Sequence, residues 1–179
     1  MVDSDLQNYQ TVFAKNAGAI AAPTAGLHFT KPLLENLSER GVKIAPVTLH
    51  VGIGTFRPVN SEDLNEHQMH AEHYSIDQNS IDTINQCRSD GGRVVAVGTT
   101  CVRVLETVGA SGVLRPCSGE TDIFIRPGHE FQFVDALLTN FHLPKSTLIV
   151  LVRAFGGDRL MKDAYARAIE EEYLSLIHI

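Results

Sequence analysis

A short apolar run that leads directly into a helical segment is the feature that most restricts the fold. Residues 93–97 read Arg-Val-Val-Ala-Val, and a short continuous apolar run is typical of a strand buried in a parallel or mixed sheet. Gly98, Thr99 and Thr100 follow, and apolar residues then recur at helical spacing. A strand that passes through a glycine turn into a helix is the repeating unit of α/β proteins.

The rest of the chain shows the same alternation. We predict helices over residues 31–40, 77–89, 148–155 and 158–173, and strands over 42–51, 121–125 and 131–137. Thr30, Asp77 and Ser146 are suited to cap three of the helices. A length of 179 residues fits one domain. We therefore expect a single α/β domain over residues 1–179, with a mixed sheet and helices on both faces in three layers.

Composition limits the classes of function. The formal net charge is −6, whereas a protein that holds nucleic acid through phosphates alone normally has a basic excess. The three cysteines show no C-x-x-C spacing, which fits a reducing compartment. No apolar run reaches transmembrane length, and the polar N-terminus is unlike a signal peptide. The expected location is the cytoplasm, without a membrane partner.

Residues 21–29, Ala-Ala-Pro-Thr-Ala-Gly-Leu-His-Phe, form the first candidate site. Pro23 has a fixed φ and Gly26 can adopt a positive φ, so the segment predicts a tight loop. Thr24 and His28 place a hydroxyl and an imidazole on that loop, next to a predicted helix start. The free N–H groups of a helix start favour an anionic or strongly polar ligand. The alternative is a packed turn that only introduces the helix.

Two glycine turns follow predicted strands. Gly52 and Gly54 come after the first strand, but a lone G-x-G is weak evidence, and Arg57-Pro58 stands where a dinucleotide-binding fingerprint would open a helix. The turn Gly98-Thr99-Thr100 resembles a phosphate or carboxylate cradle but lacks the P-loop lysine. Its alternative interpretation is a hydroxyl-capped helix.

A histidine-rich segment precedes the next predicted strand. His67, His70 and His73 are spaced by three, and Glu72 lies among them. Imidazoles and a carboxylate suit zinc or iron, yet the spacing matches neither H-E-x-x-H nor a zinc finger. On a strand, His70 and Glu72 would share one face and His73 would lie on the other. We expect a polar wall of a site or a solvated loop, and no bound metal.

Four segments, taken together, resemble a known family. They are residues 22–29, residues 47–59, residues 97–100 with Arg103 and Glu106, and residues 138–148, which include Leu-Thr-Asn-Phe-His-Leu-Pro. In this order they resemble the S-adenosylmethionine:tRNA ribosyltransferase-isomerase family of queuosine biosynthesis. The pattern His67-x-Met69-His70-x-Glu72 also fits that family. The resemblance extends from Tyr9 to Tyr173.

The chain departs from the family pattern at both ends. Family members are longer at the N-terminus, with another part of the α/β domain and an inserted small β-barrel. The chain therefore resembles the C-terminal portion, without the β-barrel. Residues 174–179 do not match the family's ending. Ala71 and His73 replace the small hydroxyl and the aromatic residue usual beside Glu72.

The resemblance implies a specific reaction. The family transfers the ribosyl part of S-adenosylmethionine, its co-substrate, to the aminomethyl group of a 7-deazaguanine base in the tRNA anticodon loop. Isomerisation gives epoxyqueuosine, and adenine and methionine are released. The reaction needs a base for a proton beside the sulfonium and an acid for the departing adenine. It implies no metal, and we expect a monomer.

The resemblance also indicates which residues form the site. The candidates for proton transfer are Glu72, His70, His28 and His142. The candidates for substrate binding are Thr24, Gly26, His50, Gly52, Gly54, Thr55, Gly98, Thr99, Thr100, Arg103 and Asn140. Arg103 could pair with the methionine carboxylate or a phosphate. If the assignment holds, four loops should converge on one cleft: residues 24–28, 52–55, 98–100 and 139–142.

Two other functions remain open at this level. The chain could be a ligand-binding fragment of such an enzyme without catalysis, which would bind S-adenosylmethionine and release no adenine. It could instead be a metal-dependent hydrolase that uses His67, His70 and His73, which elemental analysis would reveal.

Overall fold

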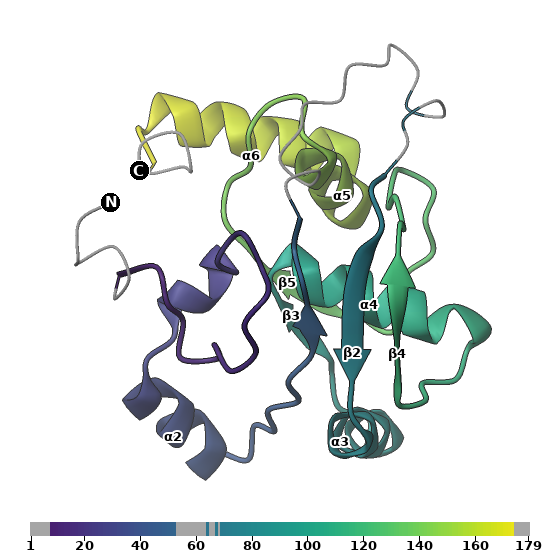
Figure 1. Ribbon diagram of the computed structural model, residues 1–179. Coiled ribbons are helices and arrows are strands. Elements are labelled where there is room, and N and C mark those ends of the chain that lie inside the picture. The colour runs from purple at the N-terminus through teal and green to yellow at the C-terminus, as the bar shows by residue number, and fades with distance from the viewer. Residues whose placement is uncertain (1–7, 53–63, 65–66, 68, 174–179) are drawn as a thin grey trace.

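The computed structural model describes residues 8–52, 64, 67 and 69–173. Helices and short strands alternate along these residues (Figure 1). The helices are η1 (Thr24–His28), α2 (Lys31–Glu39), α3 (Gln78–Ser89), α4 (Thr99–Val108), η4 (Gly109–Ser111), α5 (Thr147–Gly156) and α6 (Asp158–Glu170). The strands are β1 (Thr48–Leu49), β2 (Glu72–Ile76), β3 (Val95–Val97), β4 (Cys117–Thr121) and β5 (Ala136–Leu138).

The strands form two sheets. Strands β1, β2 and β4 make an antiparallel sheet in the order β1-β2-β4, in which Tyr74 lies opposite both Leu49 and Gly119. Strands β3 and β5 make a parallel pair, with Ala96 opposite Leu137. The predicted α/β class is confirmed. Both antiparallel and parallel pairings occur, but they lie in separate sheets and not within one.

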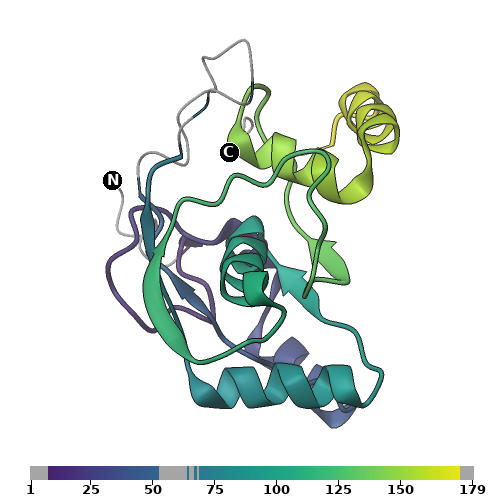
Figure 2. The same ribbon diagram turned by 90° about the vertical axis from the view of Figure 1, so that its right-hand side faces the viewer.

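Helix α4 is the centre of the molecule. It lies between the antiparallel sheet and the β3–β5 pair, as Figure 2 shows. Val102 and Leu105 of α4 join the main core, which also includes Ile81 of α3 and Leu151 of α5. Val104, on another side of α4, packs in a second core against the β1–β2 sheet. Burial on several sides fits apolar residues at Val102, Val104 and Leu105, which do not lie on a single face.

Three predicted helix starts are confirmed by their caps. The Thr30 hydroxyl accepts a hydrogen bond from the backbone N–H of Leu33 at 3.3 Å. The Asp77 carboxylate accepts from Ser80 N–H at 2.8 Å, and the Ser146 hydroxyl accepts from the N–H of residue 149 at 3.2 Å. Each cap satisfies a donor that the first turn of a helix leaves without a partner.

The predicted strands differ from the observed ones in length and position. The strand expected over 42–51 contains only Thr48–Leu49, because Pro46 has no N–H for a ladder and its carbonyl accepts the Ser80 hydroxyl at 2.7 Å. The strand expected over 121–125 lies earlier, at Cys117–Thr121, where it pairs with all of β2. The strand expected over 131–137 is shorter and lies later, at Ala136–Leu138.

Helix α6 packs differently from the prediction. The helical spacing of Leu160, Ala164, Ala168 and Ile169 in the sequence predicts that they face inward, but only Ala168 is buried. The side chains of Leu160 and Ile169 are 62% and 78% exposed. The helix ends at Glu170, three residues before the predicted end.

Among the described residues, no helix is long and apolar enough to cross a membrane.

Candidate functional site

A buried ion pair connects the antiparallel sheet to the central helix. Glu72, the first residue of β2, pairs through Oε2 with Nη1 of Arg103 on α4. Its other oxygen, Oε1, accepts the backbone N–H of Gly52 at 2.8 Å. Glu72 and Arg103 are only 4% and 3% exposed. The alternation of β2 puts Glu72 on the face that is packed against α4, so three residues predicted for the site are in contact.

Arg103 has more donors than the described residues satisfy. Its Nε and Nη2 atoms are buried and have no hydrogen-bond partner among the residues that the structure describes. A buried donor without a partner is costly. The pair with Glu72 is therefore the main compensation for burying this guanidinium.

Two loops far apart in the sequence meet at His28 and Asn140. Nε2 of His28 lies 3.1 Å from Nδ2 of Asn140, although the residues are 112 positions apart. Helix η1, which carries Thr24 and His28, also lies against the start of α4. A Cβ at Gly98 would come within 3.6 Å of the Cβ of Ala25, and Gly98 has a φ of +93°. The predicted tight loop is thus a short 3-10 helix packed on the glycine turn.

The C-terminal end of β5 also lies at this place, where η1 packs against the start of α4; we call the meeting point of these segments the junction. The N–H of Gly98 donates to the carbonyl of Leu138 at 2.8 Å, so the segment 139–142 begins beside the α4 N-terminus. Thr99 is buried there and Thr100 is half-buried. Arg103 lies one helical turn beyond Thr99 on the same side of α4. Three of the four predicted loops therefore meet at the start of α4, and the fourth is tied to α4 at Gly52 through Glu72.

Several predicted residues lie elsewhere or serve packing. His50 stacks on His73 with ring centroids 6.0 Å apart, and His73 is exposed on the opposite face of β2 from Glu72. Gly26 allows close packing, because a Cβ there would lie 3.1 Å from Thr11. Gly54 and Thr55 lie outside the described residues.

The histidines of the 67–73 segment have different neighbours. The ring of His67 packs against Phe124 at 5.2 Å, His70 is exposed, and His73 stacks on His50. Within the described parts of the chain, no group of three His, Cys, Asp or Glu side chains is placed to hold a metal ion. The alternation predicted for a strand is observed at Glu72 and His73, which lie on opposite faces of β2.

His142 is buried and neutral. Its Nε2 lies 3.1 Å from Thr139 Oγ1, its backbone N–H donates to the Tyr165 hydroxyl at 3.0 Å, and its Nδ1 has no partner among the described residues. Burial lowers the pKa of His142 from 6.5 to about 4. The imidazole is therefore uncharged near pH 7, and the imidazolium that would be the stronger acid is not the resting form.

The burial of His142 predicts a stability that falls in weak acid. Since its pKa is lower in the folded state, the unfolded chain binds more protons between about pH 6.5 and 4. This contribution is complete above pH 6.5 and is lost as the pH falls toward 4, by on the order of 3 kcal/mol. Denaturant titrations from pH 7 to 4 will measure it. His142→Gln should remove this part of the pH dependence, and an unchanged slope in that variant would contradict the prediction.

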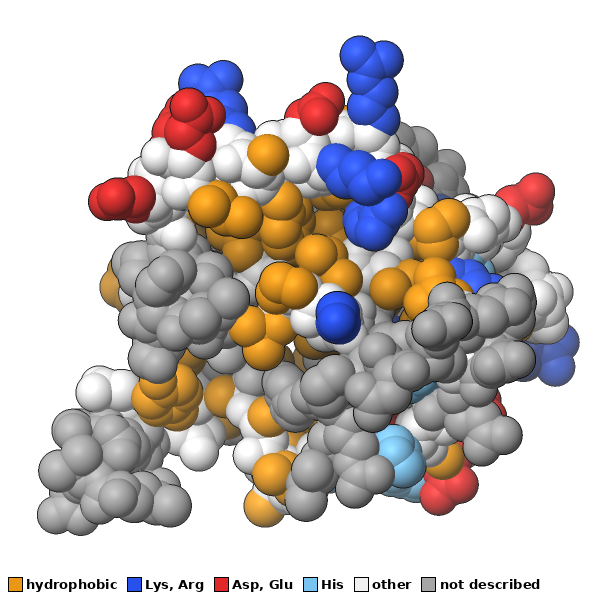
Figure 3. All heavy atoms as spheres, turned by 90° about the horizontal axis from the view of Figure 1, so that it is seen from above, with side chains coloured by type: hydrophobic (Ala, Val, Ile, Leu, Met, Phe, Trp, Pro, Cys, Tyr) orange, Lys and Arg blue, Asp and Glu red, His pale blue; other side chains and the backbone are white. Residues whose placement is uncertain are grey.

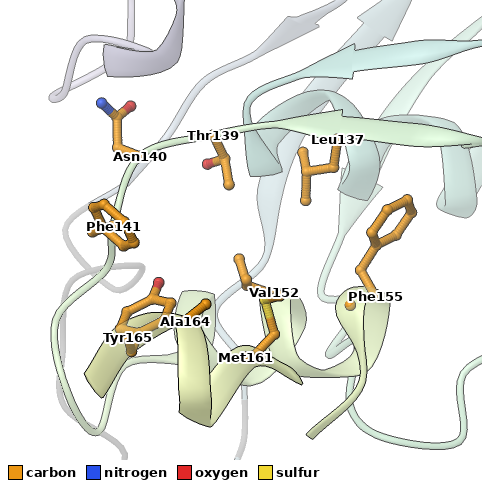
Figure 4. Close-up of a pocket in the computed structure, with 10 residues that line it drawn as sticks. Leu137, Thr139, Asn140, Phe141, Val152, Phe155, Met161, Ala164 and Tyr165 are labelled. Atoms are coloured by element: carbon orange, nitrogen blue, oxygen red, sulfur yellow. The ribbon is translucent and has the colours of Figure 1, made fainter. Parts of the chain in front are cut away.

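A pocket of about 260 Å³ opens beside the same segment. One wall is the chain from Leu137 to Phe141, and the other walls come from α5 and α6, including Val152, Met161 and Tyr165 (Figure 4). The Asn140 side chain points away from the pocket (Figure 4), in keeping with its contact to His28. Seen from the α5–α6 side, hydrophobic side chains gather on this face (Figure 3).

Glu106 is a residue whose role sequence reasoning missed. Its carboxylate is 2% exposed and accepts backbone N–H groups from Gln132, Phe133 and Val134 at 2.9 to 3.2 Å. His129 Nε2 lies 3.4 Å from the same carboxylate. These bonds remove three N–H groups from any ladder, which explains why the strand expected over 131–137 starts only at residue 136. The sequence does contain an indication of this role: an acidic residue among the apolar residues of a buried helix must have hydrogen-bond partners.

Comparisons with known proteins agree with the motifs. The family model described as "Queuosine biosynthesis protein" matches residues 1–176. The chain is 58% identical over 170 residues to the S-adenosylmethionine:tRNA ribosyltransferase-isomerase of Acetivibrio thermocellus, and 55% identical over 170 residues to that of Natranaerobius thermophilus. Each match covers 94% of this chain and 50% of the relative, so the chain spans about half the length of these relatives.

A solved structure shows the same fold. The crystal structure of S-adenosylmethionine tRNA ribosyltransferase from Thermotoga maritima matches with a TM-score of 0.71 and 43% sequence identity. The match covers 85% of this chain and 48% of that one. The resemblance inferred from the motifs is confirmed: the chain belongs to the queuosine biosynthesis protein family.

Proposed function

We propose that this chain forms part of a tRNA-modifying transferase-isomerase. In this proposal the ribosyl of S-adenosylmethionine moves to the 7-aminomethyl-7-deazaguanine base of the tRNA anticodon loop. The product is epoxyqueuosine, with release of adenine and methionine. The relatives that carry this enzyme name support the proposal. The observation that carries it for this chain is the junction at the α4 N-terminus, where His28 and Asn140 meet.

The geometry favours His28 for proton transfer. Its ring is exposed and oriented by Asn140, so a substrate proton can reach it. Glu72 already engages Arg103 and Gly52 and is buried, so its carboxylate is less accessible to a substrate proton. In this proposal, Glu72 and Arg103 fix the positions of the sheet, α4 and the Gly52 turn around the substrate. Neutral His142 orients Thr139.

The acidic net charge is compatible with tRNA as a partner. Specific recognition of an RNA loop depends on splayed bases as well as on phosphates. The proposed co-substrate is S-adenosylmethionine and no metal takes part. We further propose that the protein acts in the cytoplasm as a monomer.

The test is adenine release from S-adenosylmethionine with tRNA that carries the 7-aminomethyl-7-deazaguanine base. His28→Gln should lower turnover by about two orders of magnitude or more, since a positioned acid or base contributes about 10²- to 10⁴-fold. His73→Gln, on the outer face of β2, is the matched control and should keep turnover within about twofold, as expected of an exposed residue outside the site.

The assay is to be run on this chain and on the longer Acetivibrio thermocellus relative, with the same substitutions in the relative where its aligned residue is also histidine. Absence of adenine release by the unmodified relative would refute the function. Binding of S-adenosylmethionine by this chain without adenine release would identify it as the ligand-binding part. Equal turnover of the His28→Gln and His73→Gln variants would refute the role of His28.

A further inference from the structure

The pocket between residues 137–141 and helices α5 and α6 (the α5–α6 pocket) is separate from the Glu72–Arg103 pair. We propose that it receives a flat, uncharged, purine-type ring of the substrates. This inference rests on the proposed function and extends it, because it assigns a part of the substrate to a part of the molecule. The adenine of S-adenosylmethionine has this chemistry. The 7-deazaguanine ring of the tRNA base has it too, while the primary ammonium of its aminomethyl group must stay outside the pocket.

The lining of the α5–α6 pocket selects against charge. Among the described residues that line it, none is charged, and most are apolar. A sulfonium, a carboxylate or a phosphate would lose its hydration there without compensation. The neighbouring His142 is neutral near pH 7, so it supplies no counter-charge. An uncharged ring remains as the part of the substrates that the pocket can hold.

The side chains around the pocket suit an aromatic ligand. The rings of Phe141 and Tyr165 pack edge to face, with centroids 5.2 Å apart and planes at 88°, and both line the pocket (Figure 4). Aromatic rings contact further rings favourably in stacked or edge-to-face arrangements. The Met161 thioether adds a polarisable surface that adapts to a flat ring.

One hydroxyl at the pocket still has a proton to donate. The Tyr165 oxygen accepts the N–H of His142 at 3.0 Å, and burial raises the pKa of Tyr165, so the phenol keeps its own proton. Ring nitrogens and carbonyls of purine-type bases accept such hydrogen bonds. Thr139 offers a second hydroxyl at the pocket.

The pocket also shares a wall with the candidate site. Thr139, Asn140 and Phe141 all line it, and the amide of Asn140 lies 3.1 Å from His28 Nε2. A base in the pocket would therefore have its attached ribose near His28 and Asn140. An adenine ring in the pocket would then depart next to His28, the proposed proton-transfer group, and a 7-deazaguanine ring would be modified next to it.

The test fills the mouth of the pocket. Ala164 lines the pocket and is exposed on α6, so Ala164→Leu adds bulk there without a buried clash. Ala166→Leu is the matched control, because it makes the same change at an exposed position of α6 that is not in the lining. Leucine is a good helix former, and far-UV circular dichroism will check that both variants fold.

Binding of the free bases adenine and 7-aminomethyl-7-deazaguanine is to be measured by calorimetric titration. Ala164→Leu should weaken binding of at least one base by tenfold or more, and Ala166→Leu should change it less than twofold. The base that is lost identifies the source of the ring. Failure of the unmodified chain to bind either base, or equal binding by the two variants, would overturn the proposal and leave the pocket to a protein segment.

A second variant narrows the pocket from the other side. A Cβ at Gly156 would lie 2.8 Å from the terminal carbon of Met161, so Gly156→Ala must displace this flexible side chain from its place in the lining. Base binding should fall by at least threefold. Binding of free bases needs no turnover, so the outcome is independent of the adenine-release assay. Base binding by this chain, together with no adenine release by the unmodified longer relative, would refute the proposed function alone, and catalysis without base binding would refute this inference alone.

Discussion

Replacing Glu72 by glutamine is expected to destabilise the fold by about 3–5 kcal/mol, because removing one partner of a buried pair leaves the other charge without compensation. The amide cannot neutralise Arg103, whose Nε and Nη2 already lack partners among the described residues. The Gly52 N–H would also lose a charged acceptor. Urea unfolding of the variant and the unmodified chain, followed by circular dichroism, measures this change in the free energy of unfolding.

Glu120→Gln is the matched control for Glu72→Gln. Glu120 lies on β4 next to β2 and is exposed, so its neutralisation should change the free energy of unfolding by less than about 0.5 kcal/mol. In the proposed function Glu72 holds the sheet, α4 and the Gly52 turn in place and is not the base, so any loss of turnover in the Glu72→Gln variant should follow from its loss of stability. Unchanged stability together with lost turnover would show that Glu72 acts in chemistry and not in anchoring.

Replacing Glu106 by glutamine is expected to cost about 3 kcal/mol, the upper range for hydrogen bonds that involve a charged group. One amide nitrogen would take the place of a carboxylate oxygen and would face a backbone N–H donor. Both oxygens now accept such donors, from Gln132 on one side and from Phe133 and Val134 on the other. The loss should loosen the segment that leads into β5 and the α5–α6 pocket.

Hydrogen exchange can localise the effect of Glu106→Gln. The amides of residues 132–134 should exchange faster in the variant by more than the global loss of stability predicts. Glu130→Gln, at an exposed carboxylate two residues before Gln132, is the control and should leave both quantities unchanged. Protection of these amides equal to that of the unmodified chain would contradict the anchoring role of Glu106.

The helices were the most predictable part of this fold, because their signals are local. Caps at Thr30, Asp77 and Ser146 act within one turn of their own helix, so α2, α3 and α5 begin where the sequence predicts. The strands were less predictable, since a strand exists only where a partner pairs with it. Strand β4 forms at Cys117–Thr121 because these residues pair with all of β2. No local pattern around Cys117 reveals this pairing.

The candidate site likewise has features that were predictable from the sequence and features that were not. The motifs by themselves determined the family, the α/β class and the loops that carry polar residues, since these depend on residue type and spacing along the chain. Only the tertiary structure decided that Glu72 pairs with Arg103, that His28 meets Asn140, and that His50 lies with His73 on the other face of β2. Each of these contacts joins elements that are distant in sequence, and the packing of both sheets against α4 determines which of them meet.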